Sequence, residues 1–375
     1  MTVEAKGAVA LGDERLRRLS RMRRAMIRPE LGAICGTAAV FLFFLAVAPG
    51  SGMFSLEGVM NWGTVAAQFA IIAVGACLLM IAGEFDLSVG SMIGFAGIVI
   101  ALLSTTFGCP VWLSILAAFA AALAVGALNG FLVIRTGLPS FIVTLASLFV
   151  LRGLTIYIPI RTNGSTIIGG VRTAAADDWL APLFGGKVLG GLFVRLADIG
   201  LVDTFKAGAK AGRPVVDGIP MLMVWAVVLV VGAQLLLTRT GFGNWIFAAG
   251  GDANAARNVG VPVGRVKILM FMLSAFCATV FAACQVLEFG SAAADRGLLK
   301  EFEAIISVVI GGTLLTGGYG TVVGAALGAL IFGVVQQGLF FAGVESSLFR
   351  VFLGIILLVA VVLNTYIRRL ITGER

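Results

Sequence analysis

The sequence predicts an all-α polytopic membrane protein with about ten transmembrane helices, and three observations lead to this fold class. Of its 375 residues, 59% are hydrophobic and only 12% are charged, whereas soluble domains have about 45–50% apolar and about 25% charged residues. Apolar stretches recur along the chain at roughly the 20-residue length that spans a bilayer. Fifty glycines with no collagen-like period fit helices that approach each other closely in lipid. This composition excludes a soluble globular enzyme.

The predicted spans follow the apolar runs. In chain order these are 31–49, 62–82, 89–107, 111–134, 140–158, 220–237, 266–288, 302–316, 321–341 and 348–367. The run at 302–316 is short and interrupted by glycine, so it predicts either half a span or a helix broken within the membrane.

Basic residues near the span ends predict the orientation. The N-terminal segment 1–30 holds eight Lys and Arg residues, and the tail 368–375 carries three arginines. Because positive charge stays in the cytoplasm, both termini are predicted to be cytoplasmic, with the transmembrane domain at 31–367 between them. The alternation of spans then places a long loop at 159–219 outside the cytoplasm and a shorter loop at 238–265 inside it. The apolar piece at 188–196 is too short to span.

The stretch Gly83-Glu84-Phe85-Asp86-Leu87-Ser88-Val89-Gly90 puts two carboxylates between two apolar runs. Asp86 and Ser88 predict a cap on a helix that starts near Leu87. One interpretation is a capped loop between two helices. The other is a discontinuous helix that lines a translocation path, where irregular backbone is tolerated at membrane depth.

A weak internal sequence repeat favours the second interpretation. A shift of 234 residues superposes Gly83, Gly90 and Gly94 on Gly317, Gly324 and Gly328, and Ile71, Ile72 and Val74 on Ile305, Ile306 and Val308. Both copies run in the same direction, so the pattern predicts a parallel repeat with a second break near Gly317 and Gly318. Glycine is common in this chain, so chance also explains such matches.

A second polar stretch, residues 250–260, predicts a short helix on the cytoplasmic side. Asp252 is a good N-cap, the alanine-rich centre favours helix, and Gly260 suits the position after the helix end. Such a helix is either a docking element for a partner or an ordinary connection between spans.

Six amide side chains lie within the apolar runs: Gln68, Asn129, Gln234, Gln285, Gln336 and Gln337. Hydrogen bonding between helices is one role for them, and lining a sugar path beside some of the 27 phenylalanines is another. No catalytic or metal site is predicted, because histidine is absent and the five cysteines form no CxxC pair. The chain also lacks a G-x-x-x-x-G-K-[ST] loop, so we expect it to bind no ATP itself.

The stretch GEFDLSVGSMIGFAG at 83–97 resembles a signature of ribose-type sugar ABC permeases. The resemblance continues in family order through NGFLVIRTGLPSFIVTLASLFVLRGL at 129–154 and AAGGDANAARNVGVPVGRVK at 248–267. A fourth block, EFEAIISVVIGGTLLTGGYGTVVGAALGALIFGVVQQGL, occupies 301–339. Together the four blocks cover most of the chain from about residue 60 onwards.

The resemblance implies the fold of an ABC-importer permease with broken or re-entrant helices, in the bacterial inner membrane. It implies a dimer of permease chains, a cytoplasmic tandem-domain ATPase that binds ATP and magnesium, and a periplasmic sugar-binding protein. The residues expected to couple to the ATPase are Gly251, Asp252, Ala255, Ala256, Arg257 and Gly260. Those expected at the translocation path or broken-helix motif are Gly83, Glu84, Asp86, Ser88, Gly90, Asn129, Gly317 and Gly318.

Two features depart from the ribose type. Glu84 stands where ribose permeases usually have a small or aliphatic residue, which predicts denser negative charge at the motif. The loop at 159–219 is longer, and we expect it to face the binding protein. The expected solute is a pentose, a hexose or a related polyol.

Other functions remain open. Related permeases carry nucleosides or branched-chain amino acids. An ion-coupled secondary transporter is an alternative from a different class, but it usually needs an acidic residue or histidine deep in a span. Nothing in the sequence predicts a nucleic-acid partner, and an intramembrane enzyme lacks support because HExxH and G-x-S-x-G are absent.

Overall fold

The computed structural model describes residues 29–205 and 212–345, with separate positions between 348 and 362. Almost all of the basic segment 1–30, all of the tail 368–375 and most of the run 348–367 lie outside the described residues. The long helices are α2 (Pro29–Val47), α3 (Leu56–Ile81), α4 (Val89–Ala101) with its π-helical continuation η2 (Leu102–Thr106), α5 (Val111–Thr136), α6 (Ser140–Asn163), α10 (Met221–Arg239), α13 (Val263–Phe289) and α15 (Val322–Phe341).

Seven candidate membrane spans occur among the described residues, formed by these helices other than α2. They coincide with predicted apolar runs, which confirms the all-α polytopic class; the total of about ten spans stays a prediction. The first part of the run at 302–316 lies in α14 (Lys300–Ile310), an 11-residue helix with Gly311 as its C-cap. At about 1.5 Å per residue it reaches only about half of a 30 Å bilayer core. This length fits both expectations for the run, half a span or a helix broken within the membrane, and the choice between them stays a prediction.

The long connection after α6 begins later than predicted. α6 continues through Pro159 to Asn163 and ends at Gly164, whose φ of 69° is left-handed. The connection contains α7 (Val171–Ala174), α8 (Ala181–Gly185), β2 (Lys187–Val188) and α9 (Gly190–Asp198). The apolar piece at 188–196 therefore belongs to a short strand and a short helix, and it does not form a span.

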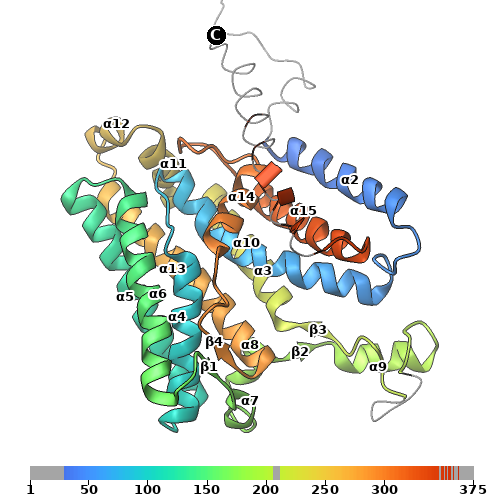
Figure 1. Ribbon diagram of the computed structural model, residues 1–375. Coiled ribbons are helices and arrows are strands. Elements are labelled where there is room, and N and C mark those ends of the chain that lie inside the picture. Colours follow the sequence, from blue (N-terminus) through green and yellow to red (C-terminus); the bar gives the residue numbers. More distant parts are fainter. Residues whose placement is uncertain are drawn as a thin grey trace, which may run out of the picture.

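Two pairs of short antiparallel strands attach this connection to the helices. β1 (Ile167–Ile168) pairs with β4 (Ala292–Ala293), which follows α13, and β2 pairs with β3 (Ile219–Pro220), which precedes α10. In Figure 1, α7, α8, β1 and β4 gather at one end of the helices. The short helices α11 (Gly241–Gly251) and α12 (Ala253–Asn258) lie at the opposite end.

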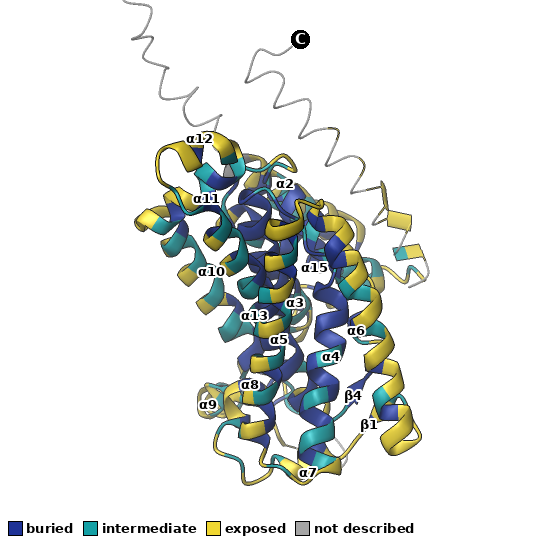
Figure 2. Cartoon of the chain, turned by 90° about the vertical axis from the view of Figure 1, so that its left-hand side faces the viewer, coloured by how far each residue is buried: buried dark blue, intermediate teal, exposed yellow. Residues whose placement is uncertain are grey.

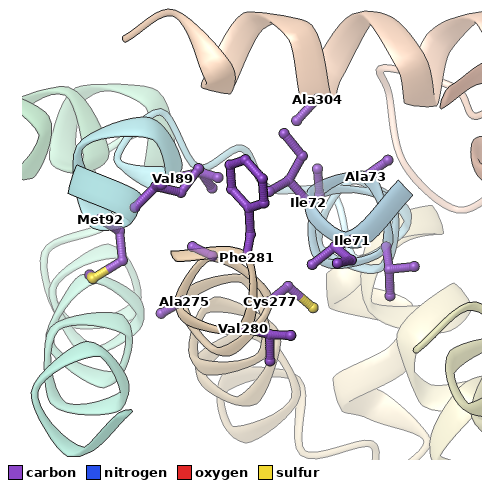
Figure 3. Packing of buried hydrophobic residues seen from close by; sticks show 14 of the residues in the cluster. Ile71, Ile72, Ala73, Val89, Met92, Ala275, Cys277, Val280, Phe281 and Ala304 are labelled. Atoms are coloured by element: carbon purple, nitrogen blue, oxygen red, sulfur yellow. The ribbon is translucent and has the colours of Figure 1, made fainter. Parts of the chain in front are cut away.

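The core lies around α3 and α13. These helices are dark along much of their length in Figure 2, whereas α6 and α10 carry many exposed residues. Figure 3 shows Ile72 of α3 and Phe281 of α13 side by side, with Val89 of α4 and Ala304 of α14 closing the cluster. A lipid-facing surface can be apolar at no cost, so exposed apolar residues on the outer helices fit a membrane protein.

Glycines allow the closest helix contacts. On α5, a Cβ added to Gly126 would lie 2.8 Å from the carbonyl oxygen of Phe271, and one on Gly130 would lie 2.7 Å from the Cα of Ile268. A Cβ on Gly333 of α15 would lie 2.6 Å from the backbone nitrogen of Ala66 on α3. Between helices in lipid, such close packing replaces hydrophobic burial as the source of attraction.

Candidate functional site

The residues 82–88 form a break between α3 and α4. Gly83 has a φ of 83°, a left-handed conformation that turns the chain away from the helix axis. The amides of Gly83 and Glu84 still donate to the carbonyls of Met80 and Leu79, at 2.9 and 3.1 Å. α4 begins at Val89, the first residue of the predicted run 89–107. Ser88 occupies the N-cap position, but its side chain makes no capping hydrogen bond, so the expected cap by this residue is wrong.

Side chains of α6 and the break itself satisfy the backbone of the break. The amide of Phe85 donates to Ser140 Oγ at 3.0 Å, and the amide of Leu87 donates to Thr144 Oγ1 at 3.1 Å. The amide of Ser88 donates to Asp86 Oδ1 at 2.9 Å. Unpaired backbone groups are costly when they are buried, so these three bonds make a non-helical segment tenable between two packed helices.

Asp86 and Asn129 are the centre of a buried polar network. Ser88 and Ser274 donate their hydroxyls to the two carboxylate oxygens of Asp86, at 2.5 and 2.8 Å. The amide nitrogen of Asn129 donates to Ser88 Oγ at 3.2 Å, and Ser147 donates to Asn129 Oδ1. The network therefore ties the start of α4 to α5, α6 and α13.

Sequence reasoning singled out Ser88, but it missed the other hydroxyl residues that bond to the break or belong to its polar network. Ser140, Thr144 and Ser147 recur at the i, i+4 and i+7 positions of one helix, so they share a face. That pattern was visible in the sequence, and a polar stripe on a span is a signal for a buried partner. Ser274 on α13 offered no such pattern.

Glu84 does not add net negative charge to the motif, contrary to the prediction from sequence. It forms an ion pair with Lys267 of α13, and the two side chains are only 11% and 13% exposed. Lys267 neutralises the charge that distinguishes this chain from the ribose type.

The second predicted break lies between α14 and α15, at residues 311–321, and it meets the first break. Gly317 has a φ of 81°, close to the 83° of Gly83, and a Cβ on Gly317 would lie 2.8 Å from the Cα of Gly83. The amide of Gly318 donates to the carbonyl of Ile81 at 2.8 Å. The two segments that the 234-residue shift relates both have the order helix, break, helix, although the second break is longer. Gly90 lies apart, where a Cβ would come within 2.4 Å of the Gly297 carbonyl.

α12 has the caps that the sequence predicted. Asp252 Oδ1 accepts from the amides of Asn254 and Ala255, both at 2.9 Å, and Gly260 beyond the helix end has a φ of 87°. Ala255 and Arg257 are exposed, whereas Ala256 is only 3% exposed and points into the protein. A partner would therefore reach Ala255 and Arg257 but not Ala256.

Two further features of the α12 end matter for docking. Gly251, Asp252 and Gly260 are exposed with Arg257. Val259, which the sequence did not single out, is 79% exposed directly after the helix. Single exposed apolar side chains are common on protein surfaces, so Val259 marks an accessible position beside α12 but does not by itself identify a contact surface.

The structure assigns contacts or a cavity to four of the six amides. Asn129 belongs to the polar network, and Gln234 Oε1 accepts from the amides of Val322 and Val323 at the start of α15, at 3.0 and 3.3 Å. Gln336 and Gln337 line a cavity of about 700 Å³ between α14 and α15. Its lining also includes three acidic residues, among them Asp295 and Glu303, and several phenylalanines, among them Phe302. Carboxylates, amides and aromatic rings can together hydrogen-bond and stack on a polyhydroxylated solute.

Comparison with known proteins identifies the family. The profile of the family described as "Branched-chain amino acid transport system / permease component" matches residues 58–361. The chain therefore belongs to this family of transport permeases.

Three relatives from Escherichia coli (strain K12) are similar over most of their length. The xylose transport system permease protein XylH is 32% identical over 90% of this chain and 91% of its own. The ribose import permease protein RbsC is 32% identical over 83% of this chain and 86% of its own. The probable ABC transporter permease protein YphD is 31% identical, covering 89% of each chain. No solved structure gives a significant match.

Proposed function

We propose that this chain is the membrane-spanning permease subunit of an ATP-driven importer for a monosaccharide. The observation that carries the proposal is the full-length similarity to permeases named for xylose and ribose transport. The cavity between α14 and α15 adds support, because its amides, carboxylates and rings suit a pentose, a hexose or a related polyol.

The partners belong to the same proposal. Two copies of the chain form the translocation path in the bacterial inner membrane, with both termini in the cytoplasm. A periplasmic sugar-binding protein delivers the solute, and the connection between α6 and α10 faces it. A separate tandem-domain ATPase binds ATP and magnesium and docks on α12. Support for this docking site is its shape: a short capped helix with Ala255 and Arg257 exposed on it and Val259 exposed directly after it.

Two other solutes are alternatives within the same family. Its description names branched-chain amino acids, and nucleosides are the other class that the sequence left open. A binding protein would distinguish these solutes before they reach the membrane, so the permease itself need not be selective.

The first experiment is a pull-down from native membranes in mild detergent, through a tag at the C-terminus, with mass spectrometry of the recovered proteins. We expect an ATPase with two nucleotide-binding domains and a periplasmic binding protein. A thermal-shift screen of that binding protein against sugars, polyols, nucleosides and branched-chain amino acids then identifies the solute. Recovery of the chain alone under several mild conditions would contradict the proposal and favour an ion-coupled transporter.

A further inference from the structure

Three segments that are distant in sequence meet directly before α12. They are the end of α11 at Gly250 and Gly251, the first break at Gly83, and the second break at Gly317 and Gly318. We call these five residues the glycine junction. It lies at the α12 end of the helices in Figure 1.

Backbone contacts backbone throughout the glycine junction. A Cβ on Gly250 would lie 1.8 Å from the carbonyl oxygen of Ile81 and 2.8 Å from the nitrogen of Gly318. A Cβ on Gly318 would lie 2.7 Å from the Cα of Gly251, and one on Gly317 would lie 2.8 Å from the oxygen of Gly250. No flexible side chain separates the three segments, so a shift of one is passed on to the others, as in any close-packed interior.

The chain on the other side of α12 is tied to the same break. Lys267, four residues into α13, forms the ion pair with Glu84 next to Gly83. The chain is therefore tied to the breaks on both sides of α12. The residues before α12 contact both breaks through the glycine junction. The helix after it, α13, contacts the first break through a shielded ion pair. α4 and α15 start where the two breaks end.

We propose that the glycine junction transmits a displacement of α12 to both broken helices, with Gly250 and Gly318 as the positioning residues of this step. The inference rests on the proposed function, in which an ATPase pushes or pulls on α12. It adds the route by which that movement reaches α4 and α15. A methyl group at Gly250 must push the end of α11 away from Ile81, which opens the contact between α12 and the breaks.

Gly251 provides the matched control within the same junction. A Cβ at Gly251 would meet nothing nearer than the Cα of Gly318 at 4.0 Å. Gly250→Ala and Gly251→Ala are thus the same chemical change at adjacent positions, and only the first one disturbs the contact. A general effect of alanine on helix stability would appear in both variants.

The test is hydrogen exchange, read by mass spectrometry, on the purified complex of the permease with its ATPase. Exchange is compared without nucleotide and after trapping with ATP and orthovanadate, so no solute is needed. In the wild type we expect trapping to change exchange at α12, at residues 82–88 and at residues 311–321. In Gly250→Ala the change at both breaks is lost while ATPase binding and the change at α12 remain, and Gly251→Ala behaves as the wild type.

Two results would overturn the inference while leaving the proposed function intact. One is a wild-type complex in which trapping alters α12 but neither break. The other is a Gly250→Ala complex that responds as the wild type does. If Gly250→Ala does not assemble, the wild-type measurement still decides, and Gly318→Ala provides a second variant. If no ATPase binds the wild-type chain at all, the proposed function is wrong and the inference falls with it.

Discussion

Lys267 forms an ion pair with Glu84 across 183 positions of sequence, and the two side chains are 13% and 11% exposed. The pair joins the beginning of α13 to the break between α3 and α4. Two shielded charges that neutralise each other avoid the several kcal/mol that each would cost alone. The pair therefore explains how a glutamate is accommodated at this position of the motif.

Removing one partner of this pair should destabilise the fold more than removing both. We expect Glu84→Gln or Lys267→Met to lower the free energy of unfolding by about 3 kcal/mol, because each leaves a shielded charge without its partner. The double variant should lose less than the sum of the single losses. Thermal unfolding in detergent, followed by intrinsic fluorescence, measures all three.

The control for these variants is the ion pair of Lys187 with Asp217, whose side chains are 49% and 59% exposed. Removing an exposed partner changes stability by about 0–1 kcal/mol, so Lys187→Met should unfold like the wild type. Strictly additive losses from Glu84→Gln and Lys267→Met would count against a direct interaction between the two residues.

Asn129→Ala should destabilise the start of α4. The change removes the donor to Ser88 Oγ and the acceptor for Ser147, and it leaves the partly buried Ser147 hydroxyl without this partner. Each unsatisfied buried group costs about 1–3 kcal/mol. Hydrogen exchange should therefore rise in residues 85–92, and the unfolding temperature should fall. Thr136→Ala is the control on the same helix: its exposed hydroxyl donates to Leu132 of its own helix. Equal behaviour of the two variants would refute the role of the network.

Gln234 is predicted to act as a remote cap for α15. Its Oε1 accepts from the amides of Val322 and Val323, which have no partner within their own helix. Gln234→Met keeps the size and removes the acceptor, so a loss of about 1 kcal/mol is expected, as for an N-cap. Gln234→Glu keeps the acceptor and should be closer to the wild type. The free energy of unfolding in denaturant distinguishes the two, and an equal loss in both would argue for a packing role.

Features of the fold could be predicted from the sequence where they are determined by residues that are neighbours in the chain. Apolar length and local caps are properties of a few neighbouring residues, so the spans, the break at Gly83 and the cap at Asp252 were all predictable. The half-length of α14 was visible as a short, glycine-interrupted run. The end of α6 was misplaced because the predicted apolar run stopped at residue 158, whereas the helix continues through Pro159 to Asn163.

The long-range pairs had no local signal. Nothing near Glu84 in sequence indicates Lys267 as its partner, and hydroxyls such as Thr144 also bond to their own helix, here to the carbonyl of Ser140 at 2.8 Å. The 234-residue repeat related Gly83 to Gly317, but equivalent positions in a repeat do not have to be in contact. Their contact follows only from the way α3, α14 and α15 pack.

Two substitutions of Asp252 distinguish its role as the N-cap of α12 from a role of its negative charge in binding the ATPase. Asp252→Ala removes the acceptor for two amides, each bonded at 2.9 Å, from a helix of only six residues. A lost cap costs about 1 kcal/mol, which weakens binding by roughly fivefold if the ATPase needs α12 folded. Asparagine caps about as well as aspartate, so Asp252→Asn should bind like the wild type if capping is the whole role. A titration of the purified ATPase onto the permease in detergent measures both variants. If Asp252→Asn loses as much affinity as Asp252→Ala, the carboxylate charge itself contacts the partner, and the capping explanation fails.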